Sequence, residues 1–470
     1  MTKLFREARR IHFVGIGGVG MSGIAEVLLT LGHRVSGSDL GESDATRRLI
    51  ARGATIAYGH RADWVTPDID VVVISSAVKF SNPEVVRARA LKIPVIPRAE
   101  MLAELMRLKD GIAVAGTHGK TTTTSLIAAI LHKAGMDPTT VIGGKVHAMG
   151  TNARLGQGDL LVAEADESDG TFLLLSPVIS VVTNIDPEHL DYYGDMDRMR
   201  AAFLEFMNRV PFYGVSVLCL DSVNVRSLLP QVRKRVITYG TTDDCEYVAR
   251  DLCVIGMETL CEVVRNGQVL GTLRLRLPGR HHALNAIAAI AVAQRLGVPF
   301  DVASEALSEF GGIHRRFELC GDAGGVMVIS DYGHHPTEIR ATLAAAREGF
   351  GRRLVVLFQP HRYTRTRDLF SEFLDAFDAA DHLVLTDIYP AGEEVVDGLS
   401  GEVLYWALRR RGHLQVTYVP RCEDLAAEVR PLLQVGDMVV VLGAGNIHGV
   451  AEELVHGLVG GAQSTTWTVQ

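Results

Sequence analysis

Residues 116–122 read Gly-Thr-His-Gly-Lys-Thr-Thr, a combination of residue types that could hold the phosphates of a nucleotide. The glycines would let backbone N–H groups approach phosphate oxygens closely. The Lys120 ammonium could reach the β- and γ-phosphates, and the Thr121 hydroxyl could bind Mg²⁺. The segment is shorter than the usual phosphate loop, because position 114 is Val rather than Gly. The alternative is a glycine-rich strand–helix turn that happens to carry a lysine.

A second glycine-rich segment, residues 15–20, reads Gly-Ile-Gly-Gly-Val-Gly. These glycines would permit a tight turn and a close approach of the backbone to a diphosphate at a helix N-terminus. Asp39, at the end of the next expected strand, could bind a ribose hydroxyl. The pattern is typical of NAD or FAD sites, but another diphosphate ligand or a purely structural turn would use the same glycines.

Two side chains could supply the metal ligands that a phosphate loop needs. Glu164 ends one apolar run and His189 follows another. A carboxylate suits Mg²⁺, whereas histidine is an unusual ligand for it and is informative only in combination. Any single acid in these loops could equally be a solvated charge. We expect that of three neighbours of Glu164, namely Asp166, Glu167 and Asp169.

Histidines and arginines are concentrated in two further segments, residues 331–338 (Asp-Tyr-Gly-His-His-Pro-Thr-Glu) and residues 359–367 (Gln-Pro-His-Arg-Tyr-Thr-Arg-Thr-Arg). Each follows an apolar run of strand length. Because the guanidinium fork of arginine matches phosphates and carboxylates, the two segments predict one wall of an anion site. The alternative is that both are exposed loops with solvated charges.

The elements that must position these segments alternate between apolar runs of strand length and helical patterns. This alternation predicts parallel βαβ units and therefore an α/β fold. In such sheets the loops after the strands meet at one edge, where ligands bind. We expect strands at residues 11–14, 35–39, 71–74, 94–96, 112–115, 160–163, 179–182, 326–330, 354–358, 383–386 and 438–442. We expect helices at residues 21–31, 101–108, 121–134, 285–296 and 338–347.

The composition is that of a globular protein of two to four domains. The 470 residues are 47% hydrophobic and 22% charged, which excludes wholesale disorder and a collagen-like chain. The net charge of −8 argues against a whole-chain nucleic-acid binder. Six cysteines are too few for a disulfide framework. The apolar runs are too short to span a bilayer, so we expect a cytoplasmic protein without membrane insertion.

The order of motifs along residues 10–450 resembles that of the Mur ligases. The motifs that carry the resemblance are the first glycine turn, G-T-H-G-K-T-T, E-A-D-E-S-D, N-I-D-P-E-H-L-D, P-G-x-H-x-x-x-N-A, R-R-F-E, D-Y-G-H-H-P-T-E and F-Q-P-H-R-Y-T-R-T-R-D-L-F. The resemblance implies three domains. These are a Rossmann-like nucleotide-sugar domain (1–108), a central P-loop ATPase-like α/β domain (109–319) and a C-terminal Rossmann-like domain (320–470) that closes over the site.

The resemblance also implies an activity in peptidoglycan precursor synthesis. An ATP- and Mg²⁺-dependent ligase would join L-alanine to the lactyl carboxylate of UDP-N-acetylmuramate through an acyl phosphate. In this family the first glycine turn holds uridine diphosphate rather than a nicotinamide cofactor. The oligomeric state does not follow from the sequence.

The family's functional residues carry over onto matching positions. ATP would contact Gly116, Thr117, His118, Gly119, Lys120, Thr121, Thr122, Asn285, Arg316 and Asp331. The UDP-muramoyl substrate would contact Gly15, Gly17, Gly18, Gly20, Asp39, Tyr332, Arg362 and Arg365. Thr121 and Glu164 would bind one Mg²⁺ and His189 would help hold a second, and the catalytic residues would be Lys120 and His335, the latter a candidate base for the amine. One departure is His282, where the family usually has asparagine, which bears on adenine binding.

Three other functions compete with this one. A ligase could join a peptide, rather than an amino acid, to the same nucleotide sugar. An oxidoreductase could use the first glycine turn alone, but it would leave the Gly-Lys-Thr loop, Glu164 and the arginine loop unexplained. A non-catalytic nucleotide-sugar binder would not need Lys120 and Thr121.

Overall fold

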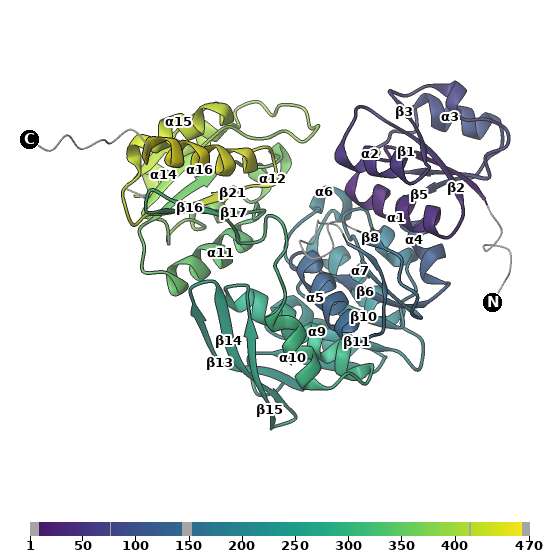
Figure 1. Cartoon of the computed structure of the whole chain (residues 1–470), viewed down its shortest axis with the longest axis horizontal. Helices are drawn as coiled ribbons and strands as arrows, with labels where there is room; N and C mark the ends of the chain where they lie inside the picture. Colours follow the sequence, from purple (N-terminus) through teal and green to yellow (C-terminus); the bar gives the residue numbers. More distant parts are fainter. Residues whose placement is uncertain (1–8, 76, 143–152, 413–414, 463–470) are drawn as a thin grey trace, which may run out of the picture. The chain divides into compact units, whose positions relative to one another are not determined.

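The computed structural model describes residues 9–75, 77–142, 153–412 and 415–462 (Figure 1). The chain forms two compact units. Unit 1 comprises residues 1–250, 262–273 and 284–311, and unit 2 comprises residues 251–261, 274–283 and 312–470. Three sheets are distributed over them. Among the described helices none combines the length and the apolar composition that crossing a membrane requires.

The first sheet, in unit 1, is parallel throughout, with strand order β3-β2-β1-β4-β5. Its strands are β1 (Arg10–Val14), β2 (Arg34–Asp39), β3 (Thr55–Tyr58), β4 (Val71–Ile74) and β5 (Val95–Pro97). Its helices are α1 (Val19–Thr30), α2 (Asp44–Ala51), α3 (Pro83–Ala90) and α4 (Arg98–Met106). The strand order reverses at β1, so the glycine turn that follows β1 lies where such sheets bind ligands.

The second sheet has ten strands in the order β15-β14-β13-β12-β11-β10-β6-β9-β7-β8. At its centre β6 (Asp110–Ala115) pairs in parallel with both β9 (Leu160–Glu164) and β10 (Ile179–Val182). The other elements up to residue 240 are α5 (Lys120–Lys133), β7 (Thr139–Val141), β8 (Ala153–Arg154), α6 (Leu190–Tyr193), α7 (Met196–Asn208), β11 (Val215–Cys219), α8 (Val223–Leu228) and β12 (Val236–Gly240). The loops after β6, β9 and β10 therefore emerge side by side.

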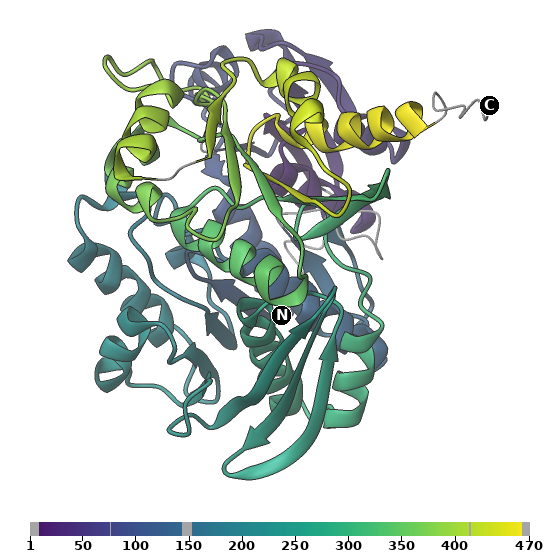
Figure 2. The same ribbon diagram turned by 90° about the vertical axis from the view of Figure 1, so that its left-hand side faces the viewer.

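The sequence pattern did not predict the three strands at one edge of this sheet, β13 (Tyr247–Ile255), β14 (Glu258–Arg265) and β15 (Gln268–Leu275) (Figure 2). Only two residues connect each pair. Asn266 and Gly267 have φ of 49° and 79°, as a tight hairpin turn requires. After them, α9 (Arg280–Arg295) begins five residues before the expected start, and α10 (Phe300–Ser308) follows.

The third sheet, in unit 2, has the order β16-β17-β21-β18-β19-β20. Its strands are β16 (Glu318–Ala323), β17 (Val326–Asp331), β18 (Leu354–Phe358), β19 (His382–Leu385), β20 (Val416–Tyr418) and β21 (Met438–Leu442). Its helices are α11 (Pro336–Gly349), α12 (Tyr363–Asp368), α13 (Phe370–Leu374), α14 (Gly401–Arg411), α15 (Leu425–Val429) and α16 (His448–Ala462). Only β16 is antiparallel to its neighbour, because a two-residue turn joins it to β17. β21 lies between β17 and β18, so the loops after these three strands leave one edge together.

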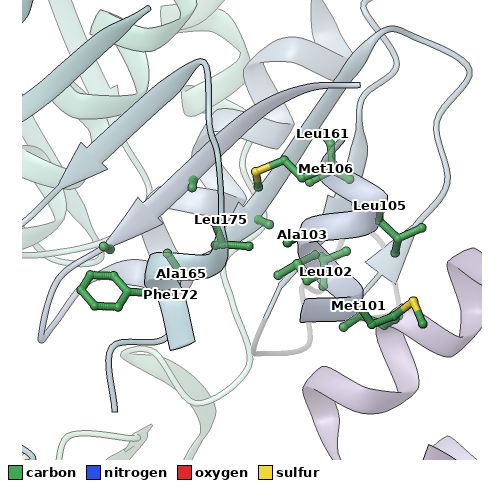
Figure 3. Packing of buried hydrophobic residues seen from close by; sticks show 14 of the residues in the cluster. Met101, Leu102, Ala103, Leu105, Met106, Leu161, Ala165, Phe172 and Leu175 are labelled. Atoms are coloured by element: carbon green, nitrogen blue, oxygen red, sulfur yellow. The ribbon is translucent and has the colours of Figure 1, made fainter. Parts of the chain in front are cut away.

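One apolar cluster in unit 1 joins the first two sheets (Figure 3). Leu102 and Met106 of α4 are each 2% exposed and belong to the same cluster as Leu161 of β9 and Phe172. Full burial of one such side chain contributes about 1.5–3 kcal/mol. A Cβ on Gly111 would overlap the Met106 side chain, so a larger residue at position 111 would displace this flexible side chain from the cluster. The helix that ends the first sheet thus anchors it to the second. The boundaries 1–108, 109–319 and 320–470 stay a prediction.

Candidate active site

The segment 116–122 connects β6 to α5, as the sequence predicts, and its backbone adopts two conformations that favour glycine. Gly116 has φ of 137° and Gly119, the residue before α5, has φ of 80°. A Cβ on Gly116 would overlap Thr183 Oγ1, and one on Gly119 would lie 2.6 Å from Asn285 Oδ1. A side chain at either position would therefore collide with Thr183 or Asn285. This bend at the start of a 14-residue helix is suited to an anion such as a phosphate.

The loop after β10 fixes the phosphate loop from the side. His118 N donates to Asn184 Oδ1 at 2.8 Å and Thr117 N to Asn184 O at 3.2 Å. Thr183 Oγ1 donates to His118 O at 2.5 Å, and the His118 ring lies 3.2 Å from the Asp186 carboxylate. These bonds hold the loop in its bent form without a ligand. Binding therefore loses little conformational entropy in ordering the loop.

Lys120 is bonded to a carboxylate that we expected to be solvated. Its Nζ donates to Glu167 Oε1 at 2.8 Å, and to the carbonyl oxygens of Gly116 at 2.5 Å and Thr117 at 3.2 Å. Glu167 is 0% exposed, so the expectation of a solvated loop charge is wrong for this residue. Residues 165–169 fold back towards the phosphate loop after β9, which a string of acids in the sequence does not reveal. The interaction keeps the ammonium folded over the loop.

Lys120 and the acids around it shift each other's pKa values. Burial raises the pKa of Glu167 to about 7, even though the Lys120 ammonium opposes the shift. Burial alone lowers the pKa of Lys120, but the charges of Glu167, Asp166 and Glu164 outweigh burial and raise it. A lysine surrounded by several carboxylates stays protonated. Its positive charge can therefore bind a phosphate group, which carries more negative charge than the single carboxylate of Glu167.

The variant Glu167→Gln is expected to change how stability depends on pH. Because the folded pKa lies above the unfolded value, the contribution of Glu167 is full below about pH 4.5 and is lost as the pH rises through about 7. The stability of the natural chain relative to this variant should fall by on the order of 2 kcal/mol between pH 5 and pH 8. Thermal unfolding of both proteins at the two pH values measures this difference in stability. If the difference is the same at pH 5 and pH 8, the raised pKa of Glu167 is contradicted.

The three predicted magnesium ligands lie at or next to the ends of three elements of unit 1. Thr121 is in the first turn of α5, Glu164 is the last residue of β9, and His189 precedes α6 with φ of 54°. Thr121 and Glu164 offer the oxygen donors that Mg²⁺ prefers, and the Glu164 charge reaches Lys120. Within the described ranges there is no group of three or more His, Cys, Asp or Glu that could hold a metal. The donors present fit an ion that keeps waters and phosphate oxygens in its shell.

The glycine turn after β1 is shaped by Asp39. Its Oδ2 accepts the Gly17 N–H at 2.6 Å and its Oδ1 accepts the Leu40 N–H at 2.8 Å. A Cβ on Gly17 would lie 2.8 Å from the same carboxylate. Gly15 has φ of 78°, and Gly18 directly precedes α1. Asp39 thus holds the turn itself, and a contact with the ribose stays a proposal.

Arg98, the first residue of α4, lies between the first glycine turn and the acidic loop that follows β9. A Cβ on Gly20 would lie 2.6 Å from its guanidinium, which also forms an ion pair of 2.9 Å with Asp166. The Asp166 side chain is 41% exposed, so it is a paired loop charge rather than a freely solvated one. Sequence reasoning missed Arg98 because a single arginine outside a motif carries no signal.

In unit 2, Asp331 ends β17 and is buried. Its carboxylate accepts N–H groups of Phe317 at 2.8 Å and Gly333 at 2.7 Å, and burial raises its pKa. The next residue, Tyr332, presents its ring to the guanidinium carbons of Arg315 and Arg316 at 4.7 and 5.1 Å. Asp331 therefore shapes a loop on which an aromatic ring and two arginines are gathered. The predicted nucleotide contacts of Asp331 and Arg316 stay proposals.

The histidine-containing segment 331–338 and the histidine- and arginine-containing segment 359–367 meet in unit 2. The rings of His334 and His361 are 5.8 Å apart, and Arg365 donates to His361 O at 3.0 Å. Arg365 is 8% exposed, so it supports the second loop from inside instead of lying in solvent. Arg362, with φ of 70°, is half-buried, and its Nε has no hydrogen-bond partner among the described residues. Arg362 therefore offers a donor for an anion.

His335 is 0% exposed and precedes α11, where its Nδ1 accepts the Thr337 N–H at 3.2 Å. The geometry assigns it a capping role, and its role as a base stays a proposal. Asparagine also caps helices well. We expect His335→Asn to retain most of its kcat, whereas His335→Ala should lose about 1 kcal/mol of stability. Steady-state kinetics and thermal unfolding measure both. A large loss of kcat in a stably folded His335→Asn would identify His335 as the base.

Two residues of α9 remain, the predicted contact Asn285 and the departure His282. Asn285, 6% exposed, accepts a hydrogen bond from Thr123 Oγ1 at 3.2 Å and lies against Gly119 of the phosphate loop. In unit 2, burial holds the pKa of His282 well below its usual range, and neither ring nitrogen has a hydrogen-bond partner among the described residues. A neutral imidazole thus replaces the family's asparagine.

Comparison with known proteins places this site in a family. The model of the Mur ligase family catalytic domain matches residues 10–110, that of the Mur ligase middle domain residues 114–293, and that of the Mur ligase glutamate ligase domain residues 315–445. The chain belongs to the Mur ligase family, and the predicted three-domain α/β fold is confirmed.

The relatives name a particular activity. The chain is 57% identical over 450 residues to the UDP-N-acetylmuramate–L-alanine ligase of Myxococcus xanthus, covering 96% of this chain and 95% of that one. It is 55% identical to the ligase of the same name from Syntrophotalea carbinolica over 97% of this chain and 99% of that one. Among solved structures, the UDP-N-acetylmuramate–alanine ligase of Thermotoga maritima is 32% identical with a TM-score of 0.81, covering 95% and 98%.

A murein peptide ligase from Psychrobacter arcticus is also similar. It is 26% identical with a TM-score of 0.70, covering 96% of this chain and 99% of that one. Both values are lower than those for the alanine ligase structure.

Proposed function

We propose that this chain is an ATP-dependent ligase that joins L-alanine to the lactyl carboxylate of UDP-N-acetylmuramate in peptidoglycan precursor synthesis. The observation that carries the proposal is the hydrogen-bonded loop 116–122 with Lys120 folded over it, in a chain that is 57% identical to a ligase of that name. Because ATP and nucleotide sugars are cytoplasmic, we place the reaction in the cytoplasm.

The first step would convert the substrate carboxylate into an acyl phosphate, with ADP as product. A carboxylate is a poor acyl donor, whereas phosphate is a good leaving group from the acyl phosphate. The backbone N–H groups of residues 116–122 would bind the ATP phosphates, and Lys120 would stabilise the charge on the group in transfer. Glu167 keeps Lys120 charged and oriented. Magnesium, which Thr121, Glu164 and His189 would hold, would neutralise phosphate charge.

The second step would join the amine of L-alanine to the activated carbonyl carbon and release phosphate. Arg362 and Tyr332 would face the nucleotide-sugar substrate, and Arg365 would keep the Arg362 loop in place. The glycine turn 15–20 would bind the uridine diphosphate through backbone N–H groups. Because water competes for an acyl phosphate, closing of the C-terminal domain over the site would protect the intermediate.

The experiment that tests the function is an ADP-release assay with the full chain, ATP, Mg²⁺ and UDP-N-acetylmuramate. L-alanine, glycine, L-serine and a muropeptide-type peptide are compared as acceptors. We expect ADP release with L-alanine far above that with the peptide. Release only with the peptide would assign the chain to the peptide ligases, and no release with any acceptor would contradict a ligase function.

A further inference from the structure

A buried chain of hydrogen bonds crosses the face of the first sheet against which α3 packs. We call it the Glu84 network; it consists of His12, Ser36, Ser38, His60 and Glu84. The Glu84 carboxylate, 0% exposed, bonds His12 Nε2 at 2.7 Å through Oε2 and His60 Nδ1 at 2.8 Å through Oε1. The remaining ring nitrogen of His12 lies 2.9 Å from Ser36 Oγ. None of these residues belongs to the phosphate-binding segments.

The protonation of the network follows from its geometry. Burial pushes the pKa of Glu84 upwards, but the hydrogen bonds of His12, His60 and Ser38 outweigh it, so that the pKa is lowered and the group is a carboxylate. A carboxylate only accepts hydrogen bonds, so both imidazoles must point an N–H at it. Glu84 thereby sets the orientation of both rings.

The His60 end of the network reaches the strand that holds the glycine turn. The same His60 Nδ1–H that donates to Glu84 lies 3.1 Å from Ser38 Oγ, at the end of β2, so the Ser38 oxygen shares this N–H as a second acceptor and its own O–H is left to donate to the Glu84 carboxylate. The backbone oxygen of the same Ser38 accepts the N–H groups of Gly15 at 2.8 Å and Ile16 at 3.0 Å. The next residue, Asp39, accepts the Gly17 N–H through its carboxylate. Residues 38–39 thus carry three of the hydrogen bonds that shape the turn.

A second connection closes a ring around this segment. The N–H of Gly59, the residue before His60, donates to the backbone oxygen of Asp39 at 2.7 Å. Residues 38–39 are therefore held from their side chain by His60 and from their backbone by Gly59. A shift of His60 would be transmitted to Asp39 and from there to the turn.

We propose that Glu84 is a positioning residue for the nucleotide-sugar site, holding the end of β2 and hence the glycine turn 15–20 through His60 and Ser38. The proposal rests on the proposed function, because it takes the turn to bind uridine diphosphate. A buried carboxylate with two imidazoles is costly to desolvate, and apolar side chains of similar volume would pack the same helix at least as stably. Apolar side chains in place of the Glu84 network would lose the hydrogen bonds to Ser38, and these bonds are the part of the network that reaches the glycine turn.

The test is calorimetric titration of the full chain with UDP-N-acetylmuramate and, separately, with MgATP. Glu84→Gln keeps the shape but turns one acceptor into a donor, so that one imidazole loses its orientation. We expect its Kd for UDP-N-acetylmuramate to rise about tenfold and its Kd for MgATP to stay within about twofold. Ser38→Ala removes the contact to the strand and should shift the same Kd in the same direction.

Val85→Ala is the matched control. Val85 is 0% exposed, follows Glu84 in α3 and contributes only apolar packing, so its loss destabilises the same helix by leaving a cavity. If Val85→Ala weakens UDP-N-acetylmuramate binding as much as Glu84→Gln does, the effect is general destabilisation and the proposal is overturned. The proposal also fails if Glu84→Gln binds like the natural chain. If Glu84→Gln does not fold, Ser38→Ala replaces it in the test, and its Kd for UDP-N-acetylmuramate is compared with that of Val85→Ala in the same way. If the natural chain binds no UDP-N-acetylmuramate, it is the proposed function that fails.

Discussion

Lys120→Ala is expected to reduce ADP formation by a factor of about 1,000 or more, while UDP-N-acetylmuramate binding stays close to that of the natural chain. A cation that stabilises the transferring phosphoryl group mainly in the transition state contributes several kcal/mol to catalysis. The glycine turn of the first sheet does not contain Lys120, so sugar-nucleotide binding should persist. The measurements are kcat for ADP release and calorimetry with UDP-N-acetylmuramate.

Two further variants separate catalysis from folding in that experiment. Removal of Lys120 leaves the buried Glu167 without its cation, so the double variant Lys120→Ala/Glu167→Gln should regain stability but not activity. Lys133, in the last turn of the same helix, bonds Glu305 and Glu309 at the surface. Its alanine variant should behave like the natural chain. Near-normal turnover of Lys120→Ala would remove this loop from the reaction.

Arg362→Ala is expected to raise the KM for UDP-N-acetylmuramate by tenfold or more and that for ATP much less. The unpartnered Nε of Arg362 offers a donor to an anion, and charged hydrogen bonds contribute about 1.5–3 kcal/mol. Arg362→Lys should restore only part of the loss, because an ammonium cannot reproduce a planar fork. Steady-state kinetics with each substrate varied in turn measure the split.

Arg365 and Arg367 provide the comparison for this prediction. Arg365→Ala should raise the same KM, because its bond to His361 O supports the loop, and it should also lower thermal stability. Arg367 is exposed and pairs with Asp368, so Arg367→Ala should have little effect. Unchanged constants in the Arg362 and Arg365 variants would exclude this loop from the site. A rise confined to ATP would assign the arginines to the nucleotide.

Most of the parallel strands and the loops after them were predictable, because a buried parallel strand is a continuous apolar run and its loop follows at once. The parallel strands β3, β7, β11, β12 and β20 were missed, although every residue of β11 is buried. The edge strands β13–β15 were not predicted either. Their partly exposed residues, such as those of β13, interrupt the apolar runs with polar residues. The start of α9 was predicted at residue 285, where the alanine-rich part begins, whereas the helix begins at Arg280.

The candidate site was predictable in its residue types but not in how each one is used. The motif E-A-D-E-S-D contains four acids with similar surroundings in the sequence, and only the fold shows that Glu167 turns inward to Lys120 while Asp166 pairs with Arg98. Likewise, the loop 359–367 contains three arginines, of which Arg365 is buried and Arg367 exposed. Whether one of these charged side chains is buried depends on how the backbone folds around it, and the residue type alone does not show this.

The chain passes between units 1 and 2 at five places, after residues 250, 261, 273, 283 and 311. During synthesis, which runs from the N-terminus, unit 1 is incomplete until residue 311 has left the ribosome. By then the tips of β13 and β14 have emerged without their neighbours. Val254 N, for example, bonds Glu348, which is translated almost a hundred residues later. A gene cut after codon 311 would therefore not yield two self-sufficient halves, and we expect the two fragments to assemble only when they are expressed in the same cell.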